Sequence, residues 1–228
     1  MIDHDLIVSI TSSSHVHSLT VAPRFLLVSL NITAILGEAT VYDRREQLRR
    51  MTKDGGLGDA YSVTLERIKA QSGGKTRLAM EVLMWISRSE RPMSPDKLCH
   101  AIGVQKGSTC PNLDKMPSIQ TLLASCLGLV VVEREESAVR LVHFTLQEYL
   151  NSRSEIFQNP YSIMAEVCLI YLNFDCIRQL RPAPPKTHPQ YSWSKPCSPA
   201  LDDALQKYPF LDHASSFWGP YAFLEALM

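Results

Sequence analysis

The stretch LVVVEREESAVRLVHFTLQEYL at residues 129–150 limits most strongly how this chain can fold. Two runs rich in valine and leucine flank the polar turn REES, which predicts a β-hairpin. FTLQEYLNS then predicts a helix that starts at Phe144 or Thr145. Each signal is weak alone, so the fold is inferred from the order of the elements.

Three helices are predicted before the hairpin. The first covers 75–89, where apolar residues recur at helical spacing. In the second, Ser94 suits the N-cap and Gly103 the C-cap. The third, SIQTLLASCLG, is expected to end at Gly128. Three helices, a hairpin and a helix predict a winged-helix domain, and the fold class is mainly α with one small β-hairpin and flanking helices.

The flanking segments are predicted to be mostly helical. An apolar helix is expected at 24–36, a basic amphipathic helix at 41–53 and another apolar helix at 161–177. The most apolar run, VAPRFLLVSLNITAIL, contains Arg24 and is shorter than the roughly 20 residues of a membrane span. The predicted domains are a disordered arm (1–22), a helical lead-in (23–74), the winged helix (75–153), a helical extension (154–180), a Pro-rich linker (181–199) and short C-terminal helices (200–228).

The tetrapeptide GGKT at 73–76 looks like the end of a phosphate-binding loop. Such a loop follows a buried strand, and its first glycine gives the tight turn. Here Lys69 stands where that glycine belongs, and an amphipathic helix precedes the loop. We interpret the tetrapeptide as a helix–helix turn and expect no ATPase activity from it.

Charge and cysteine usage favour a protein that does not bind nucleic acid or membranes. Lys plus Arg equals Asp plus Glu, with 23 of each, so there is no bulk attraction to anionic surfaces. The six cysteines lack CxxC spacing and predict buried free thiols in a reducing compartment, which indicates the cytoplasm. Neither His15 with His17 nor Cys99–His100 with Cys110 reaches the ligand count of a zinc site. We expect no metal, no cofactor of its own and no catalytic residue.

A winged helix raises the alternative of a DNA-binding regulator. The third helix would then enter the major groove, but SIQTLLASCLG has no Lys or Arg to read base edges. The wing turn EREES is mostly acidic and would face phosphate. Protein packing is therefore favoured, with DNA binding kept as the alternative.

Several stretches together resemble one family, among them RFLLVSLNITAILGEATV, HFTLQEYL and FLDHASSFWG. They resemble the segment after the NACHT core in fungal STAND-type ankyrin-repeat proteins, which carries a winged helix of the GPI inositol-deacylase type. The resemblance covers about residues 24–220. It implies a non-catalytic module that couples nucleotide state to opening or assembly. It also implies protein partners: a NACHT core upstream and ankyrin repeats downstream, or self-association through the apolar face of 24–36.

His143 has two interpretations. It follows the second wing strand, so it is either a core histidine hydrogen-bonded to backbone or a functional residue. The functional interpretation comes from the resemblance, in which a histidine that begins an H-x-x-x-Q-E stretch contacts a phosphate of the bound nucleotide. His143, Gln147 and Glu148 fit that spacing. The resemblance therefore implies that His143 is a nucleotide-phosphate sensor when a NACHT core is present.

Overall fold

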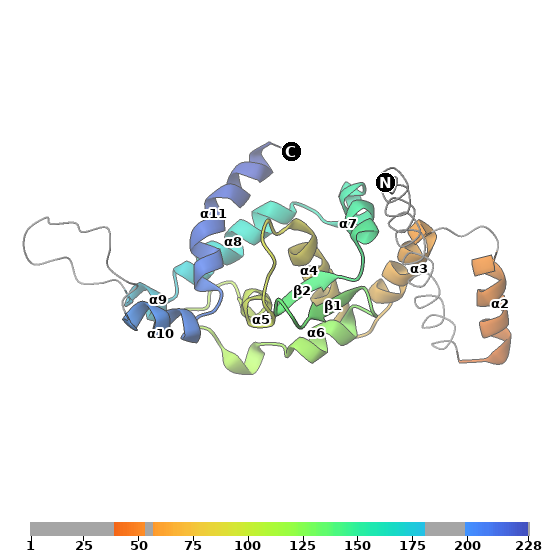
Figure 1. Cartoon of the computed structure of the whole chain (residues 1–228), viewed down its shortest axis with the longest axis horizontal. Coiled ribbons are helices and arrows are strands. Elements are labelled where there is room, and N and C mark those ends of the chain that lie inside the picture. The colour runs from red at the N-terminus through yellow and green to blue at the C-terminus, as the bar shows by residue number, and fades with distance from the viewer. Residues whose placement is uncertain (1–38, 53–56, 181–198, 228) are drawn as a thin grey trace, which may run out of the picture. The chain divides into compact units, whose positions relative to one another are not determined.

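The computed structural model describes residues 39–52, 57–180 and 199–227 of the chain (Figure 1). The predicted arm at 1–22, the predicted helix at 24–36 and the predicted linker up to residue 198 lie outside the described residues. The chain divides into two compact units. The first holds the described residues up to Gln71 together with Val142–Ser152, and the second holds those in Ser72–Leu141 and after Arg153.

The first unit is helical and contains α2 (Val41–Thr52), α3 (Leu57–Lys69) and α7 (Phe144–Asn151). Helix α3 buries one stripe of side chains, because its apolar residues recur every three or four positions. Helix α7 contributes Leu146 and Leu150, which are fully buried, and it packs against α3. The buried stripe of α3 is Ala60, Tyr61, Thr64, Leu65 and Ile68.

The second unit begins with three helices, α4 (Lys75–Arg88), α5 (Pro95–Gly103) and α6 (Ile119–Ser125). Ser94 caps α5 by accepting a hydrogen bond from the Lys97 amide, and Ser118 caps α6 in the same way through the Thr121 amide. The cap at Ser94 confirms the start predicted from the sequence. The three helices pack against one another.

The predicted role of Gly103 as a C-cap is wrong. Gly103 is the last residue of α5, Val104 is the C-cap, and Gly103 is not among the glycines with positive φ. A Cβ at Gly103 would lie 2.8 Å from Cγ of Met116, so the close approach of Met116 explains the glycine. The third helix also ends earlier than predicted, at Ser125, and Gly128 lies beyond it with φ 86°.

The predicted hairpin is confirmed as β1 (Val130–Glu133) paired antiparallel with β2 (Ala138–Leu141). Val132 lies opposite Val139, and the register continues to Val130 opposite Leu141. On its other side, β2 pairs with Met93, because the Val139 amide donates to the Met93 carbonyl at 2.8 Å. This extra bridge joins the segment before α5 to the hairpin.

The C-terminal part adds α8 (Pro160–Leu172), α9 (Asp175–Arg178), α10 (Pro199–Lys207) and α11 (Leu211–Ala226). The single helix predicted at 161–177 is instead α8 and α9, separated at Asn173 and Phe174. Helix α11, with 16 residues, is longer than the short helix predicted. It lies along α8 (Figure 1).

The pairing of α8 with α11 follows from their apolar stripes. Met164, Cys168 and Tyr171 recur at helical spacing on α8, and all three are fully buried. Phe217 and Tyr221 form the matching stripe on α11. The predicted mainly α class, with one small β-hairpin and flanking helices, is therefore confirmed.

Candidate functional site

His143 is the N-cap of α7, and it is half-buried. Its Nδ1 atom accepts a hydrogen bond from the Thr145 amide at 3.3 Å and lies 2.9 Å from Thr145 Oγ1. Strand β2 ends at Leu141, so His143 follows the strand and does not belong to it. The first amides of a helix have no hydrogen-bond acceptor within the helix itself. In α7 the imidazole of His143 accepts from one of them, as a serine or asparagine side chain does at other helix starts.

The cap determines where the imidazole carries its proton. A ring nitrogen that accepts from an amide must be unprotonated, so neutral His143 carries its proton on Nε2. Thr145 Oγ1 also lies 2.8 Å from the hydroxyl of Tyr61, which extends the chain of hydrogen bonds into α3. With Nδ1 engaged in this way, Nε2–H is a donor, and no hydrogen bond to it is found among the described residues.

Two further contacts fix α7 on α3. The hydroxyls of Ser62 and Tyr149 lie 2.6 Å apart, and the rings of Tyr61 and Tyr149 meet edge to face with centroids 5.5 Å apart. Burial raises the pKa of Tyr61, and the hydrogen bond with Thr145 lowers it in part, so Tyr61 stays a neutral phenol. The helix start that carries His143 is thereby held in place by polar contacts.

The other two residues of the predicted motif lie on α7 itself. Gln147 follows His143 by one helical turn and is half-buried, whereas Glu148 is exposed. The structure therefore brings His143 and Gln147 to one side of the helix start. Sequence spacing predicted this neighbourhood, but it gave no sign of the cap or of Thr145 and Tyr61.

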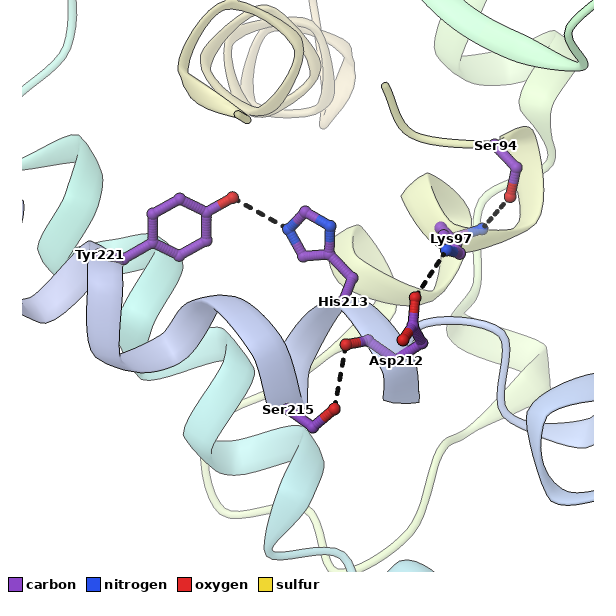
Figure 2. A network of polar contacts seen from close by, with 6 residues as sticks. All are labelled: Ser94, Lys97, Asp212, His213, Ser215 and Tyr221. Atoms are coloured by element: carbon purple, nitrogen blue, oxygen red, sulfur yellow. Dashed lines mark hydrogen bonds and ion pairs between the residues drawn. The ribbon is translucent and has the colours of Figure 1, made fainter. Parts of the chain in front are cut away.

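A second histidine, which the sequence did not single out, lies inside the second unit. His213 on α11 is 3% exposed, and its Nε2 atom lies 2.9 Å from the Tyr221 hydroxyl (Figure 2). Burial lowers its pKa to about 4, with the charge of Lys97 as a smaller cause. Its ring lies 5.3 Å from that of Phe210 and 4.7 Å from that of Phe217. Neutral, enclosed and already hydrogen-bonded, His213 stabilises the fold.

The neighbouring polar contacts tie α11 to α5. Asp212 pairs with Lys97 at 3.4 Å, and Lys97 is in turn the residue whose amide Ser94 caps (Figure 2). This pair is largely exposed and is therefore worth less than about 1 kcal/mol. The network of Figure 2 thus contains a buried histidine with a structural role and a largely exposed ion pair.

The surface that a DNA-binding winged helix would use is poor in free cations. On α6 the exposed side chains are Gln120, Thr121 and Ala124. In the wing, Arg140 is paired with Glu133 at 2.6 Å and also contacts Glu136. These contacts neutralise Arg140 and leave a mostly acidic turn, which repels a phosphate backbone.

The remaining sequence candidates have simple structural positions. Gly73 and Gly74 form a turn between α3 and α4, with Gly73 at φ 67° and Gly74 as the N-cap, which confirms the helix–helix turn. Cys126 and Cys168 are buried free thiols as predicted, but Cys110 is exposed. Within the described ranges, no three His, Cys, Asp or Glu side chains come together to hold a metal ion. His15 and His17 lie outside the described residues.

Comparison with known families addresses the central part of the chain. The family model described as GPI inositol-deacylase, winged helix domain, matches residues 65–163. Residues 65–163 are therefore similar to that winged-helix domain. The matched stretch begins within α3 and ends within α8, so it includes both His143 and the hairpin. No match was found among curated proteins or among solved structures.

The match confirms the winged-helix part of the predicted fold class. Its family description names an enzyme, but the description refers to the winged helix and places no catalytic residue in this chain. Among the described residues, no helix is both long and apolar enough to cross a bilayer.

Proposed function

We propose that this chain is a non-catalytic regulatory and interaction module of a STAND protein of the NACHT type, acting in the cytoplasm. Its winged helix couples the nucleotide state of a NACHT core to opening or assembly of the protein. Its partners are proteins: the NACHT core and ankyrin repeats of the family, or a second copy of the chain. It has no cofactor of its own.

The observation that carries this proposal is the cap at His143. Because Nδ1 accepts from the Thr145 amide, Nε2–H is a donor with a defined direction from a helix start. An imidazole N–H can donate to a phosphate oxygen. Loss of that contact when the nucleotide is exchanged would then favour the open state, since a contact shifts an equilibrium only if it differs between the two states.

The alternative function, a DNA-binding regulator, has less support. It needs cations on α6 and on the wing, and the exposed side chains of α6 are Gln120, Thr121 and Ala124. The acidic turn beside Arg140 also argues against DNA binding, because it would repel phosphate. We therefore assign the winged helix to protein contacts.

Two substitutions at the position of His143 test the proposal in a relative that contains a NACHT core. His143→Ala removes both the cap and the Nε2–H donor, whereas His143→Ser keeps a capping oxygen and removes the donor. A hydrogen bond to a charged group contributes about 1.5–3 kcal/mol, so both variants should weaken ADP binding by roughly 10- to 100-fold. Signalling in the absence of ligand should rise in both.

The serine variant decides between the two roles of His143. If it keeps normal ADP affinity while the alanine variant is unstable, His143 is a structural cap and the sensor role is wrong. Because residues 71–80 of this chain do not match a phosphate-binding loop, we expect it neither to bind ATP nor to hydrolyse it through this segment.

A further inference from the structure

Two cysteines far apart in the sequence meet in the second unit. The Asp175 amide donates to the Thr109 carbonyl at 2.8 Å, so the loop before α6 lies directly against the start of α9. Cys110 follows Thr109, and Cys176 follows Asp175. The hydrogen bond therefore brings together the two residues that precede the cysteines, and it holds Cys110 and Cys176 on neighbouring segments.

The side chains of the two cysteines also meet. The Cys110 thiol lies within hydrogen-bonding reach of the Cys176 thiol and of the Cys176 amide. On the other side, the hydroxyl of Tyr208 reaches the Cys176 sulfur. Cys110 is exposed and Cys176 is half-buried, so an oxidant in solution has access to the pair.

We propose that Cys110 and Cys176 form a reversible disulfide when the chain meets a peroxide. The reduced pair is the state expected in a reducing compartment, and the disulfide is a modification of it. This proposal does not depend on the function assigned to the winged helix.

The reaction balances with one peroxide for each pair. The Cys110 sulfur attacks a peroxide oxygen, the O–O bond breaks, and a sulfenic acid and water are formed. The Cys176 sulfur then attacks the Cys110 sulfur, the S–O bond breaks, and a second water leaves with the remaining thiol proton. Both sulfurs are oxidised, the peroxide is reduced, and a thiol reductant reverses the change.

The surroundings of Cys110 restrain the reaction at neutral pH. The hydrogen bond with Cys176 raises the pKa of the Cys110 thiol, and the charge of Asp175 adds to this effect. The thiolate is the nucleophile, so oxidation is slow near pH 7 and faster at mildly alkaline pH.

Formation of the disulfide would fasten the loop that carries Cys110 to the end of α8 and to α9. Lys106 already pairs with Glu166 of α8 at 2.6 Å, through exposed side chains. A covalent link replaces these weak contacts with one that also restricts the unfolded chain. For a loop of this length in a chain of this size, the melting temperature should rise by roughly 5–10 °C.

The experiment uses the full chain at pH 8, treated with hydrogen peroxide and then blocked with an alkylating reagent. Non-reducing peptide mass spectrometry should find the 110–176 cross-linked peptide, and a thiol count should fall by two. The melting temperature should rise, and dithiothreitol should return it to the starting value. Cys110→Ser and Cys176→Ser should each abolish the cross-link and the shift.

Two other variants are matched controls. Cys99→Ser removes a half-buried thiol elsewhere, and Cys197→Ser removes a thiol outside the described residues. Both should keep the cross-link. If the cross-linked peptide contains Cys197, or if two chains are joined, or if peroxide leaves six free thiols, the proposal is wrong.

Discussion

The Nε2 atom of His213 lies 2.9 Å from the hydroxyl oxygen of Tyr221, eight residues further along α11. Both side chains are buried, and Trp85 lies edge-on to both rings. This contact satisfies two polar groups inside an aromatic cluster, where an unpaired polar group would be costly. It also makes the stability of the second unit sensitive to acid.

Acid should destabilise the chain through His213. Its pKa is about 4 in the folded state, against an ordinary value of 6.5, so the unfolded chain binds the proton more readily. The contribution of His213 is complete above pH 6.5 and is lost as the pH falls to about 4. Its size is roughly 2–3 kcal/mol.

Urea unfolding at pH 7 and at pH 4.5 measures this effect, with His213→Phe as the control. The difference in the free energy of unfolding between the two pH values should be smaller in the variant by about 2 kcal/mol. An equal difference in both proteins would show that other groups cause the acid sensitivity.

Removal of the Tyr221 hydroxyl should destabilise the second unit. Tyr221→Phe leaves the Nε2 atom of His213 buried without its partner, at a cost of about 1–3 kcal/mol. His213→Phe removes one partner of the Tyr221 hydroxyl, but Ser89 also hydrogen-bonds this hydroxyl. The loss of that partner should therefore destabilise the unit less than Tyr221→Phe does. A double-mutant cycle of the free energy of unfolding should give a coupling of about 1 kcal/mol. A coupling near zero would mean that the two side chains do not depend on each other.

The cap at His143 should contribute modestly to stability. His143→Ala leaves the Thr145 amide without its acceptor and should lower the free energy of unfolding by about 1 kcal/mol. His143→Ser restores an acceptor and should return most of the loss. Thermal unfolding of the chain itself gives the comparison. If serine is no better than alanine, then the packing of the ring against Phe144, and not the cap, is what matters.

The effect of Gly103→Ala on the free energy of unfolding should depend on Met116. Alanine is favoured over glycine in a helix by about 1 kcal/mol, but the new Cβ would lie 2.8 Å from the Met116 Cγ. We expect the substitution to be neutral or destabilising in the natural chain and stabilising by about 1 kcal/mol when Met116 is also alanine. Chemical denaturation of the four proteins measures this. A stabilising effect in both backgrounds would mean that Met116 moves away freely.

The chain should bind duplex DNA no more tightly than a neutral control protein does. A protein that neutralises several phosphates loses affinity steeply as salt rises. Titration of a fluorescent duplex at low and at moderate salt should therefore show little binding and no steep slope. As a counterpart, Glu135 and Glu136 changed to Lys should introduce weak, salt-sensitive binding at the wing. Tight, salt-sensitive binding by the natural chain would instead support the DNA-binding alternative.

Local signals predicted much of the fold. Ser94 predicted the start of α5, and two runs rich in valine and leucine around a polar turn predicted the hairpin. Predictions failed where contacts between separate segments determine the structure. Gly103 is required by the close approach of Met116, which lies in the following loop. The break between α8 and α9 at Asn173 has no proline or glycine that would have predicted it.

The site was predicted only as a residue and a spacing. His143 was identified, but its role as a cap depends on where β2 ends, which is set by pairing with β1 and Met93. The contact of Tyr61 with Thr145 joins residues 84 positions apart, so no local pattern contains it. The proximity of Cys110 and Cys176 could not be predicted for the same reason, because the two residues are far apart in the sequence.

The bridge between Met93 and Val139 determines where another strand could be added. A hairpin offers two edges for strand addition, and edge pairing is a common route to both assembly and aggregation. Here the outer edge of β2 is occupied at Val139, whereas the described strands leave the outer edge of β1 without a neighbour. Val131 on β1 is 42% exposed. Growth of the sheet by an incoming strand is therefore directed to the edge of β1, and a hairpin with one open edge can accept one strand but cannot extend into a filament by itself.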